Sequence, residues 1–236
     1  MALNKARLDR FLAQHCQISR KQVRLMLAQG RVKINSSVAR NIEQVIDTFT
    51  HITLDNKVIQ DNTAYYVMLN KPVGVVSATK DEQHKTVLDL LEYPFKNELH
   101  SVGRLDLNTS GLVLLTNDSR WSERLTLPEH KVSKRYIVHL KNKLDEAYVN
   151  AFAEGMYFSF EDITTKSAKL TIIADYQAEV ELTEGRYHQI KRMFGRFRNP
   201  VTALHRASIG TVVLDSQLAA GQSRMLTLQE VENIAQ

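Results

Sequence analysis

Short apolar segments rich in β-forming residues recur along residues 65–214 of this chain. The strands that they predict are Tyr65–Leu69, Leu112–Thr116, Arg135–Leu140, Lys169–Ala174, Ala178–Thr183, Val201–Ser208 and Gly210–Leu214. Helical periodicity appears near Thr86–Leu91, Asp118–Leu125, Asp145–Glu154 and His188–Arg198. Because strands and helices do not alternate as they would in a doubly wound parallel sheet, the pattern predicts an α+β fold.

Charge is distributed unevenly along the chain. Residues 1–60 hold ten Lys or Arg and four Asp or Glu, whereas residues 61–236 hold twenty-one and twenty-two. A polar stretch centred on Asp61 and Asn62 predicts a linker between these parts. We therefore expect two domains, residues 1–60 and residues 61–236, with the surplus positive charge on the first, where it favours a polyanionic partner.

The amino-terminal part reads as two helices followed by a strand. Apolar spacing predicts one helix from Ala6 to Gln14 and a second from Arg20 to about Gln29, with Ser19 as its N-cap and Gly30 ending it. The alternating segment 31–34 predicts a strand. Its basic residues also fit a merely solvated face, which is the usual meaning of a charge run.

This layout resembles the S4-type RNA-binding domain. The residues that carry the resemblance are Arg7-Leu8-Asp9 with Phe11-Leu12, Ile18-Ser19-Arg20, and Gln29-Gly30-Arg31-Val32-Lys33-Ile34-Asn35. The resemblance implies contacts to RNA phosphates, which position a nucleic acid without reading its bases. The expected RNA-binding residues here are Arg7, Ser19, Arg20, Lys21, Arg24, Arg31 and Lys33.

Several classes of protein are disfavoured. The only cysteine, Cys16, forms no internal disulfide and no thiolate metal cluster. No apolar run is long enough to span a membrane, and the amino terminus lacks a signal-peptide layout, so we expect a cytoplasmic protein without membrane attachment.

Four segments of the second part carry polar groups typical of a functional site. They are residues 69–74, 103–111, 134–138 and 184–194. Each has an ordinary structural explanation: a Pro/Gly turn, a loop whose polar side chains bond the backbone, a half-buried tyrosine on a strand, and a solvated basic helix. No single segment therefore assigns a function.

Taken together, in this order and behind an S4-like unit, the four segments resemble the pseudouridine synthases of the small-subunit synthase A type. The loop Gly-Arg-Leu-Asp…Thr-Ser-Gly-Leu at 103–112 is highly specific to pseudouridine synthases, and Gly-Arg-Tyr-His-Gln-Ile-Lys-Arg-Met-Phe at 185–194 is specific to this branch. Asn108 departs from the pattern, where Asp is common. The resemblance spans essentially the whole chain and implies a catalytic domain with a mixed, mostly antiparallel sheet.

The resemblance also implies residue roles. Asp106 is the expected catalytic carboxylate, acting as nucleophile or as base toward the ribose; Tyr136 is expected to stack on the uracil, and Arg186 to pair with Asp106. Arg104 is expected to brace the space that the extruded base leaves. Further RNA contacts are expected from Lys71, Lys134, Arg135, Lys191 and Arg192. Because the reaction is an isomerisation, no cofactor and no metal is expected.

The implied substrate is one uridine of 16S rRNA, U516, within a small-subunit assembly intermediate, and the enzyme is expected to be a monomer. Three alternatives stay open at this point. A sister synthase acting on 23S rRNA shares every motif, a non-catalytic rRNA-binding assembly factor would use the S4-like unit alone, and a hydrolytic nucleosidase would release free uracil.

Overall fold

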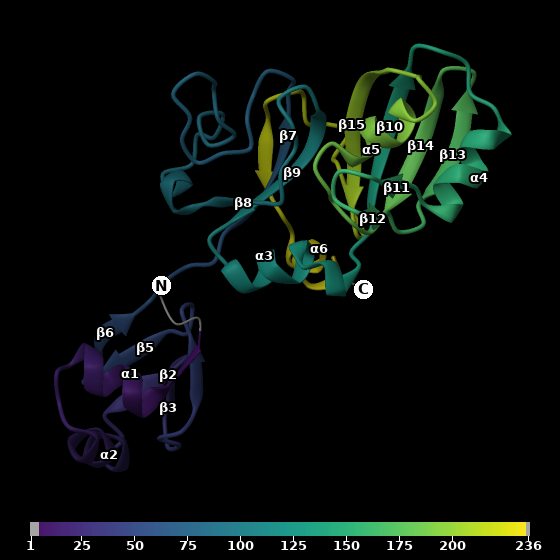
Figure 1. The fold of residues 1–236 in the computed structure, drawn as a ribbon. Helices are drawn as coiled ribbons and strands as arrows, with labels where there is room; N and C mark the ends of the chain where they lie inside the picture. Colours follow the sequence, from purple (N-terminus) through teal and green to yellow (C-terminus); the bar gives the residue numbers. More distant parts are fainter. Residues whose placement is uncertain (1–4, 235–236) are drawn as a thin grey trace. The chain divides into compact units, whose positions relative to one another are not determined.

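The computed structural model describes residues 5–234 and divides into two compact units between Ala64 and Tyr65 (Figure 1). No helix within residues 5–234 combines the length and the apolar character needed to cross a membrane. The predicted α+β class, with a small S4-like domain and a mixed, mostly antiparallel sheet, is confirmed.

The smaller unit packs two helices against short strands. Its elements are β1 (Lys5–Arg7), α1 (Leu8–His15), α2 (Arg20–Ala28), β2 (Val32–Ile34), β3 (Ser37–Val38), β4 (Val45–Asp47), β5 (Ile52–Leu54) and β6 (Lys57–Gln60). The order β3-β2-β5-β6 forms one sheet, and β1 pairs with β4. Leu8, Leu12, Val23, Leu27 and Val32 are buried together with Ile52 in one apolar cluster, so this unit has a core of its own.

The ends of α2 follow the sequence prediction. The Ser19 hydroxyl accepts a hydrogen bond from the Gln22 backbone N–H, and the Gln22 side chain accepts from the Ser19 backbone N–H, which completes a capping box. Gly30 follows the helix with φ +70°, a backbone conformation that favours glycine.

The larger unit is built on a nine-stranded sheet. Its path is β13 (Lys169–Ala174), β14 (Gln177–Leu182), β10 (Lys134–Leu140), β15 (Val201–Ile209), β9 (Ser110–Thr116), β7 (Tyr66–Lys71) and β17 (Ser223–Met225). Off this path, β16 (Val212–Val213) pairs with β15, and β8 (His100–Val102) pairs with β9. The short strands β11 (Tyr157–Phe158) and β12 (Ile163–Thr164) form a separate hairpin.

A single strand joins the two halves of this sheet. β15 pairs antiparallel with β10 and parallel with β9, with Arg206 opposite both Tyr136 and Gly111. Among the described strands of the sheet, this β15–β9 pair is the parallel one. At the junction, a Cβ on Gly111 would lie 2.3 Å from the Arg206 carbonyl oxygen, and Gly111 has φ +107°. Only glycine fits this close backbone approach.

Helices cover both faces of the sheet (Figure 1). The helices are α3 (Ser119–Thr126), α4 (Glu146–Glu154), α5 (Gln189–Gly195) and α6 (Leu228–Asn233), with short 3₁₀ turns at Lys96–Glu98 and Pro128–His130. One apolar cluster includes Phe152 of α4 and Phe194 of α5, and the cluster on the other face includes Trp121 of α3.

One predicted helix is absent. Residues 86–91 form turns, in which the Asp89 carboxylate accepts hydrogen bonds from the backbone N–H and the hydroxyl of Thr86.

Candidate active site

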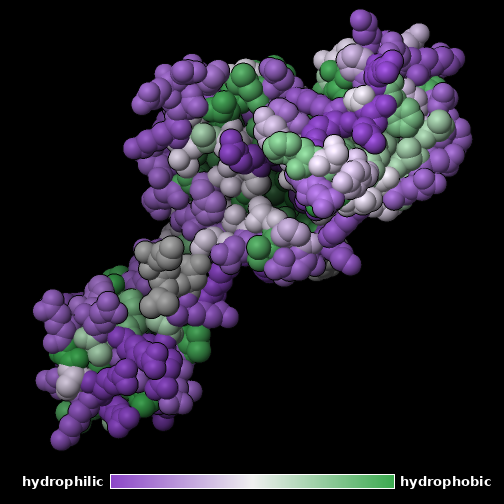
Figure 2. All heavy atoms as spheres, in the orientation of Figure 1, coloured by the Kyte–Doolittle hydropathy of each residue, from purple (hydrophilic) through white to green (hydrophobic). Residues whose placement is uncertain are grey.

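A cavity of about 560 Å³ lies in the larger unit between the loop 103–109 and the start of α5. Its lining residues are Val76, Ser77, Arg104, Leu105, Asp106, Leu107, Thr109, Tyr136, Leu182, Gly185, Arg186, Tyr187, His188, Gln189, Ile190, Lys191 and Leu204. In Figure 2 the surface of this unit is hollowed between the part that carries β7 and β9 and the part that carries β10, β14 and β15. Three of the four motif segments therefore meet at one cavity.

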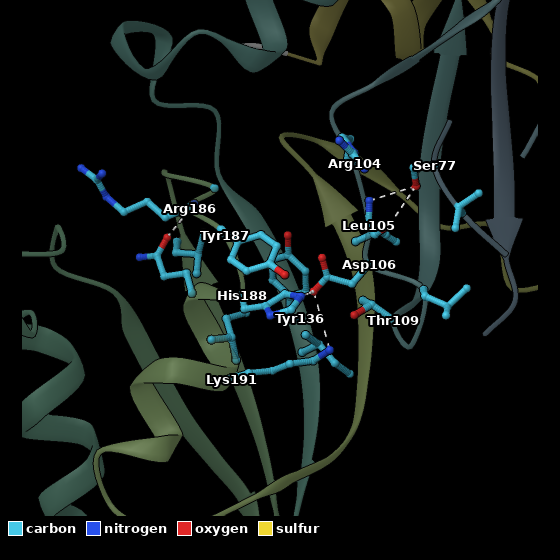
Figure 3. A pocket seen from close by; sticks show the side chains of 17 residues that line it. Ser77, Arg104, Leu105, Asp106, Thr109, Tyr136, Arg186, Tyr187, His188 and Lys191 are labelled. Carbon is cyan, nitrogen blue, oxygen red and sulfur yellow. Dashed lines mark hydrogen bonds and ion pairs between the residues drawn. The ribbon is translucent and has the colours of Figure 1, made fainter. Parts of the chain in front are cut away.

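Buried side chains hold the backbone of the loop that carries Asp106. The Arg206 guanidinium donates to the Arg104 carbonyl at 3.4 Å, and the Lys71 ammonium donates to the Asp106 carbonyl at 3.2 Å. The Ser77 hydroxyl both donates to the Leu105 carbonyl and accepts from its N–H, each at 3.0 Å (Figure 3). Three successive carbonyls are thus fixed by three different strands or loops, which limits the movement of Asp106.

Lys71 holds the backbone of this loop, whereas the sequence predicted that it would contact RNA. Its side chain is fully buried, and its ammonium also donates to the carbonyls of Pro72 at 2.9 Å and Thr109 at 2.7 Å. Burial lowers the pKa of Lys71 to about 8, and the nearby Arg206 charge adds to this, while Asp106 acts in the opposite direction. A side chain without solvent exposure cannot meet an RNA phosphate, so the expectation for Lys71 is wrong.

Two side chains from the start of α5, His188 and Lys191, contact the Asp106 carboxylate. Its Oδ2 lies 3.3 Å from His188 Nε2 and 3.6 Å from Lys191 Nζ. Among residues 5–234, no hydrogen bond or ion pair joins Oδ1, and the Asp106 side chain is 34% exposed (Figure 3). One carboxylate oxygen is therefore held by the protein, and the other is open to the cavity.

The predicted partner of Asp106, Arg186, is paired elsewhere. Its Nε donates to Glu184 at 3.1 Å, and Figure 3 shows its guanidinium directed away from Asp106. Glu184 is buried and also accepts from the Gln189 side chain at 2.7 Å. Arg186 thus belongs to the network that anchors the start of α5, and the expectation that its charge lies beside Asp106 is corrected in favour of Lys191 and His188.

Two tyrosines line the cavity at different depths. Tyr136, on β10, is 8% exposed, whereas Tyr187 is 75% exposed. The Tyr187 ring stacks on His188, with 3.8 Å between ring centroids and 21° between ring planes. Tyr136 therefore forms part of the inner wall, and Tyr187 lies where solvent reaches it.

The remaining basic residues of the larger unit differ in availability. Arg104 is exposed at the cavity. Lys134 donates to the Val132 carbonyl, and burial lowers its pKa to about 8. Arg135 donates to the Ser208 hydroxyl, and Arg192 pairs with Glu161. Of these four, Arg104 is the one that lines the cavity, and it forms no salt bridge among the described residues.

In the smaller unit, three of the expected RNA-binding cations are exposed and form no salt bridge among residues 5–64, namely Arg20, Lys21 and Arg24, although the Arg20 charge contributes to lowering the pKa of Asp9. Arg7 pairs with Asp9 and Glu43, and Arg31 pairs with Asp55. Lys33 donates to the Asn56 side chain, and the Ser19 hydroxyl serves its own helix as N-cap. The basic residues of α2 are thus the group most open to a phosphate backbone.

Sequence reasoning assigned no catalytic place to His188 or Lys191. A signal was present for Lys191, because Ile190 and Met193 fix the apolar face of α5 and leave Lys191 off that face, and His188 comes directly before the helix. Ser77 and Arg206 had no such signal, since their partners are backbone carbonyls of a loop distant in sequence.

Three features define the class of this protein as an RNA-modifying enzyme: an S4-like unit, a mostly antiparallel sheet, and an aspartate on a loop whose backbone is held in place at a cavity. Comparison with known proteins agrees. The family model described as RNA pseudouridylate synthase matches residues 65–195, and the S4 domain model matches residues 6–48. The chain belongs to the RNA pseudouridylate synthase family and is a pseudouridine synthase.

Within the family, the chain is similar to proteins named ribosomal small subunit pseudouridine synthase A. It is 46% identical to the one from Pseudomonas aeruginosa over 95% of this chain and 98% of that protein. It is 39% identical to the one from Escherichia coli K12 over 97% of this chain and 99% of that protein. A crystal structure of a pseudouridylate synthase superposes with a TM-score of 0.71 at 41% identity, covering 97% of this chain and 99% of that one.

Proposed function

We propose that this chain converts one uridine of 16S rRNA, U516, to pseudouridine, with Asp106 as the catalytic carboxylate. The single observation that carries the proposal is the asymmetric setting of Asp106: Oδ2 is bound by Lys191 and His188, and Oδ1 faces a cavity of about 560 Å³. The choice of small-subunit rRNA is supported by the name, ribosomal small subunit pseudouridine synthase A, of the proteins that the chain resembles over nearly its whole length, and the position U516 is part of the proposal.

The setting suits the reaction. The bond from ribose C1′ to uracil N1 breaks, the detached uracil turns, and C5 bonds to C1′; the C5 proton leaves and N1 gains one, so the RNA is unchanged in mass. Asp106 Oδ1 either attacks C1′ or removes a proton from the ribose, and either role needs an ionised carboxylate. The Lys191 ammonium, 3.6 Å from Oδ2, stabilises that charge in a partly enclosed site.

The walls of the cavity have separate tasks. Tyr136, at the inner wall, presents an aromatic face on which the extruded uracil stacks, with a hydroxyl available for the C5 proton. Arg104 extends from the same loop as Asp106 and takes the space that the base leaves in the RNA. Extruding a base costs a few kcal/mol, which RNA contacts outside the cavity must offset.

The smaller unit supplies those contacts. Arg20, Lys21 and Arg24 are exposed on α2 and neutralise phosphates without reading sequence. The full partner in this proposal is rRNA within a small-subunit assembly intermediate, bound by one copy of the chain.

The test uses small-subunit particles from a strain that lacks the protein. Wild-type protein is expected to introduce one pseudouridine, at U516, and Asp106→Asn is expected to bind the particle with wild-type affinity and to form no pseudouridine, as read by chemical mapping and gel shift. Asp175→Asn is the matched control, since that carboxylate pairs with Lys143 outside the cavity.

Turnover by Asp106→Asn would refute the catalytic assignment. A pseudouridine in 23S rRNA and not in 16S rRNA would identify the sister activity. Free uracil among the products would identify a nucleosidase, and binding without any product from the wild type would identify an assembly factor.

A further inference from the structure

The cavity carries an aromatic group that the reaction above leaves unused. Tyr187 lines the cavity and is 75% exposed, whereas Tyr136 is 8% exposed. The inner tyrosine suffices for one extruded uracil. The outer ring has no partner within the described chain on its solvent side. We propose that Tyr187, backed by His188, forms a second base-binding subsite that takes the nucleobase adjacent to the target uridine; this rests on the proposed function.

One face of the Tyr187 ring is already occupied. It stacks on the His188 imidazole at 3.8 Å, with 21° between the ring planes. His188 is in turn held by its 3.3 Å contact with Asp106 and has a left-handed backbone, φ +49°. The outer face of Tyr187 is therefore the one that a base reaches, and the tyrosine is fixed relative to the catalytic carboxylate.

The main chain of Tyr187 is fixed independently. Its carbonyl accepts from an Arg192 guanidinium nitrogen at 3.4 Å, and the same guanidinium pairs with Glu161 and lies 3.8 Å over the Phe158 ring. This arrangement ties the subsite to the β11–β12 hairpin. A stacking surface that is held before RNA arrives loses little entropy on binding.

The position of the ring favours a neighbouring base over the target itself. Figure 3 shows Tyr187 on the side of the cavity that carries Arg186 and His188, with Asp106 and Arg104 on the opposite side. In the proposed function the target ribose reaches Asp106 Oδ1 and its base stacks on Tyr136, both of which line the cavity. The next nucleotide then passes the outer, solvent-facing side of Tyr187.

Stacking of a base on an aromatic side chain contributes about 1–3 kcal/mol, which corresponds to about 5- to 150-fold in affinity. Tyr187→Ala is expected to raise KM for RNA by that factor. Tyr187→Phe keeps the ring and is expected to keep the wild-type KM. Tyr176→Ala, at a tyrosine that is 53% exposed outside the cavity, is the matched control.

The decisive measurement is fluorescence from 2-aminopurine placed next to the target uridine, on either side, in an RNA fragment bound to the full-length protein. The wild type, Tyr187→Phe and Tyr176→Ala are expected to quench it at one of the two positions, and Tyr187→Ala is expected not to. Equal quenching by Tyr187→Ala, or a loss confined to the saturating rate, overturns the subsite.

The two proposals fail separately. If the wild type makes no pseudouridine, the proposed function is wrong, and the aminopurine signal still decides whether Tyr187 binds a base. If the wild type is active and Tyr187→Ala is indistinguishable from it in KM and quenching, only the subsite is wrong.

Discussion

Gly111→Ala is expected to destabilise the larger unit strongly. The new Cβ would lie 2.3 Å from the Arg206 carbonyl oxygen and 2.7 Å from its nitrogen, so β9 and β15 must separate where they join the two halves of the sheet. The left-handed backbone, φ +107°, costs a residue other than glycine about 1–2 kcal/mol. Overpacking against backbone adds about 1–3 kcal/mol. We expect a total loss of about 2–5 kcal/mol in the free energy of unfolding.

The chain offers a control with the same backbone penalty and no clash. Gly221 has φ +89°, and a Cβ there meets no atom within 4 Å, so Gly221→Ala is expected to lose only the conformational part, about 1–2 kcal/mol. The single tryptophan, Trp121, is buried in the larger unit, and its fluorescence in a urea titration therefore follows this unit alone. Equal midpoints for the two variants, at equal slopes, would refute the argument from close approach.

Three further predictions concern the site. Lys191→Met removes the ammonium group beside Asp106 and is expected to lower the rate at saturating RNA roughly tenfold, with little change in RNA affinity, in single-turnover assays. Lys191→Arg should partly restore that rate. Ser77→Ala removes both hydrogen bonds to Leu105 and is expected to cost about 1–3 kcal/mol of stability and to lower the rate without raising KM. Burial lowers the pKa of Lys134 to about 8, so above that pH the unfolded chain binds one more proton at this group than the folded chain does. The free energy of unfolding is therefore expected to rise by about 2 kcal/mol between about pH 8 and pH 10 because of this group. Lys134→Met should lack this rise in parallel urea titrations.

Much of the sheet could be predicted because its signal is local. Apolar β-forming residues fill β9 and β13, and the expected bounds, Leu112–Thr116 and Lys169–Ala174, match the observed strands within two residues. The order of strands in the sheet was not available from such patterns. Pairing of β15 with β9 depends on residues about ninety apart, at a contact that glycine alone permits.

The composition of the site was more accessible than its geometry. Motif identity brought the loop of Asp106, the strand of Tyr136 and the start of α5 to one cavity. Motif identity did not show which charged side chains pair with one another. Arg186, for example, donates to Glu184, two residues before it in the chain. The burial of Lys71 could have been predicted, because it lies two residues after the buried Leu69 and therefore faces the same side of its strand.

The place of β15 between β9 and β10 has a consequence for the newly made protein. Asp106 precedes β9, and Tyr136 lies on β10, so the strand that joins these parts of the cavity, residues 201–209, is synthesised after both of them. Pairing of strands that are distant in sequence is slow, and here it must wait for this later strand. Until β15 is in place, no strand of the sheet holds the carboxylate and the tyrosine together, so the cavity is completed late in folding.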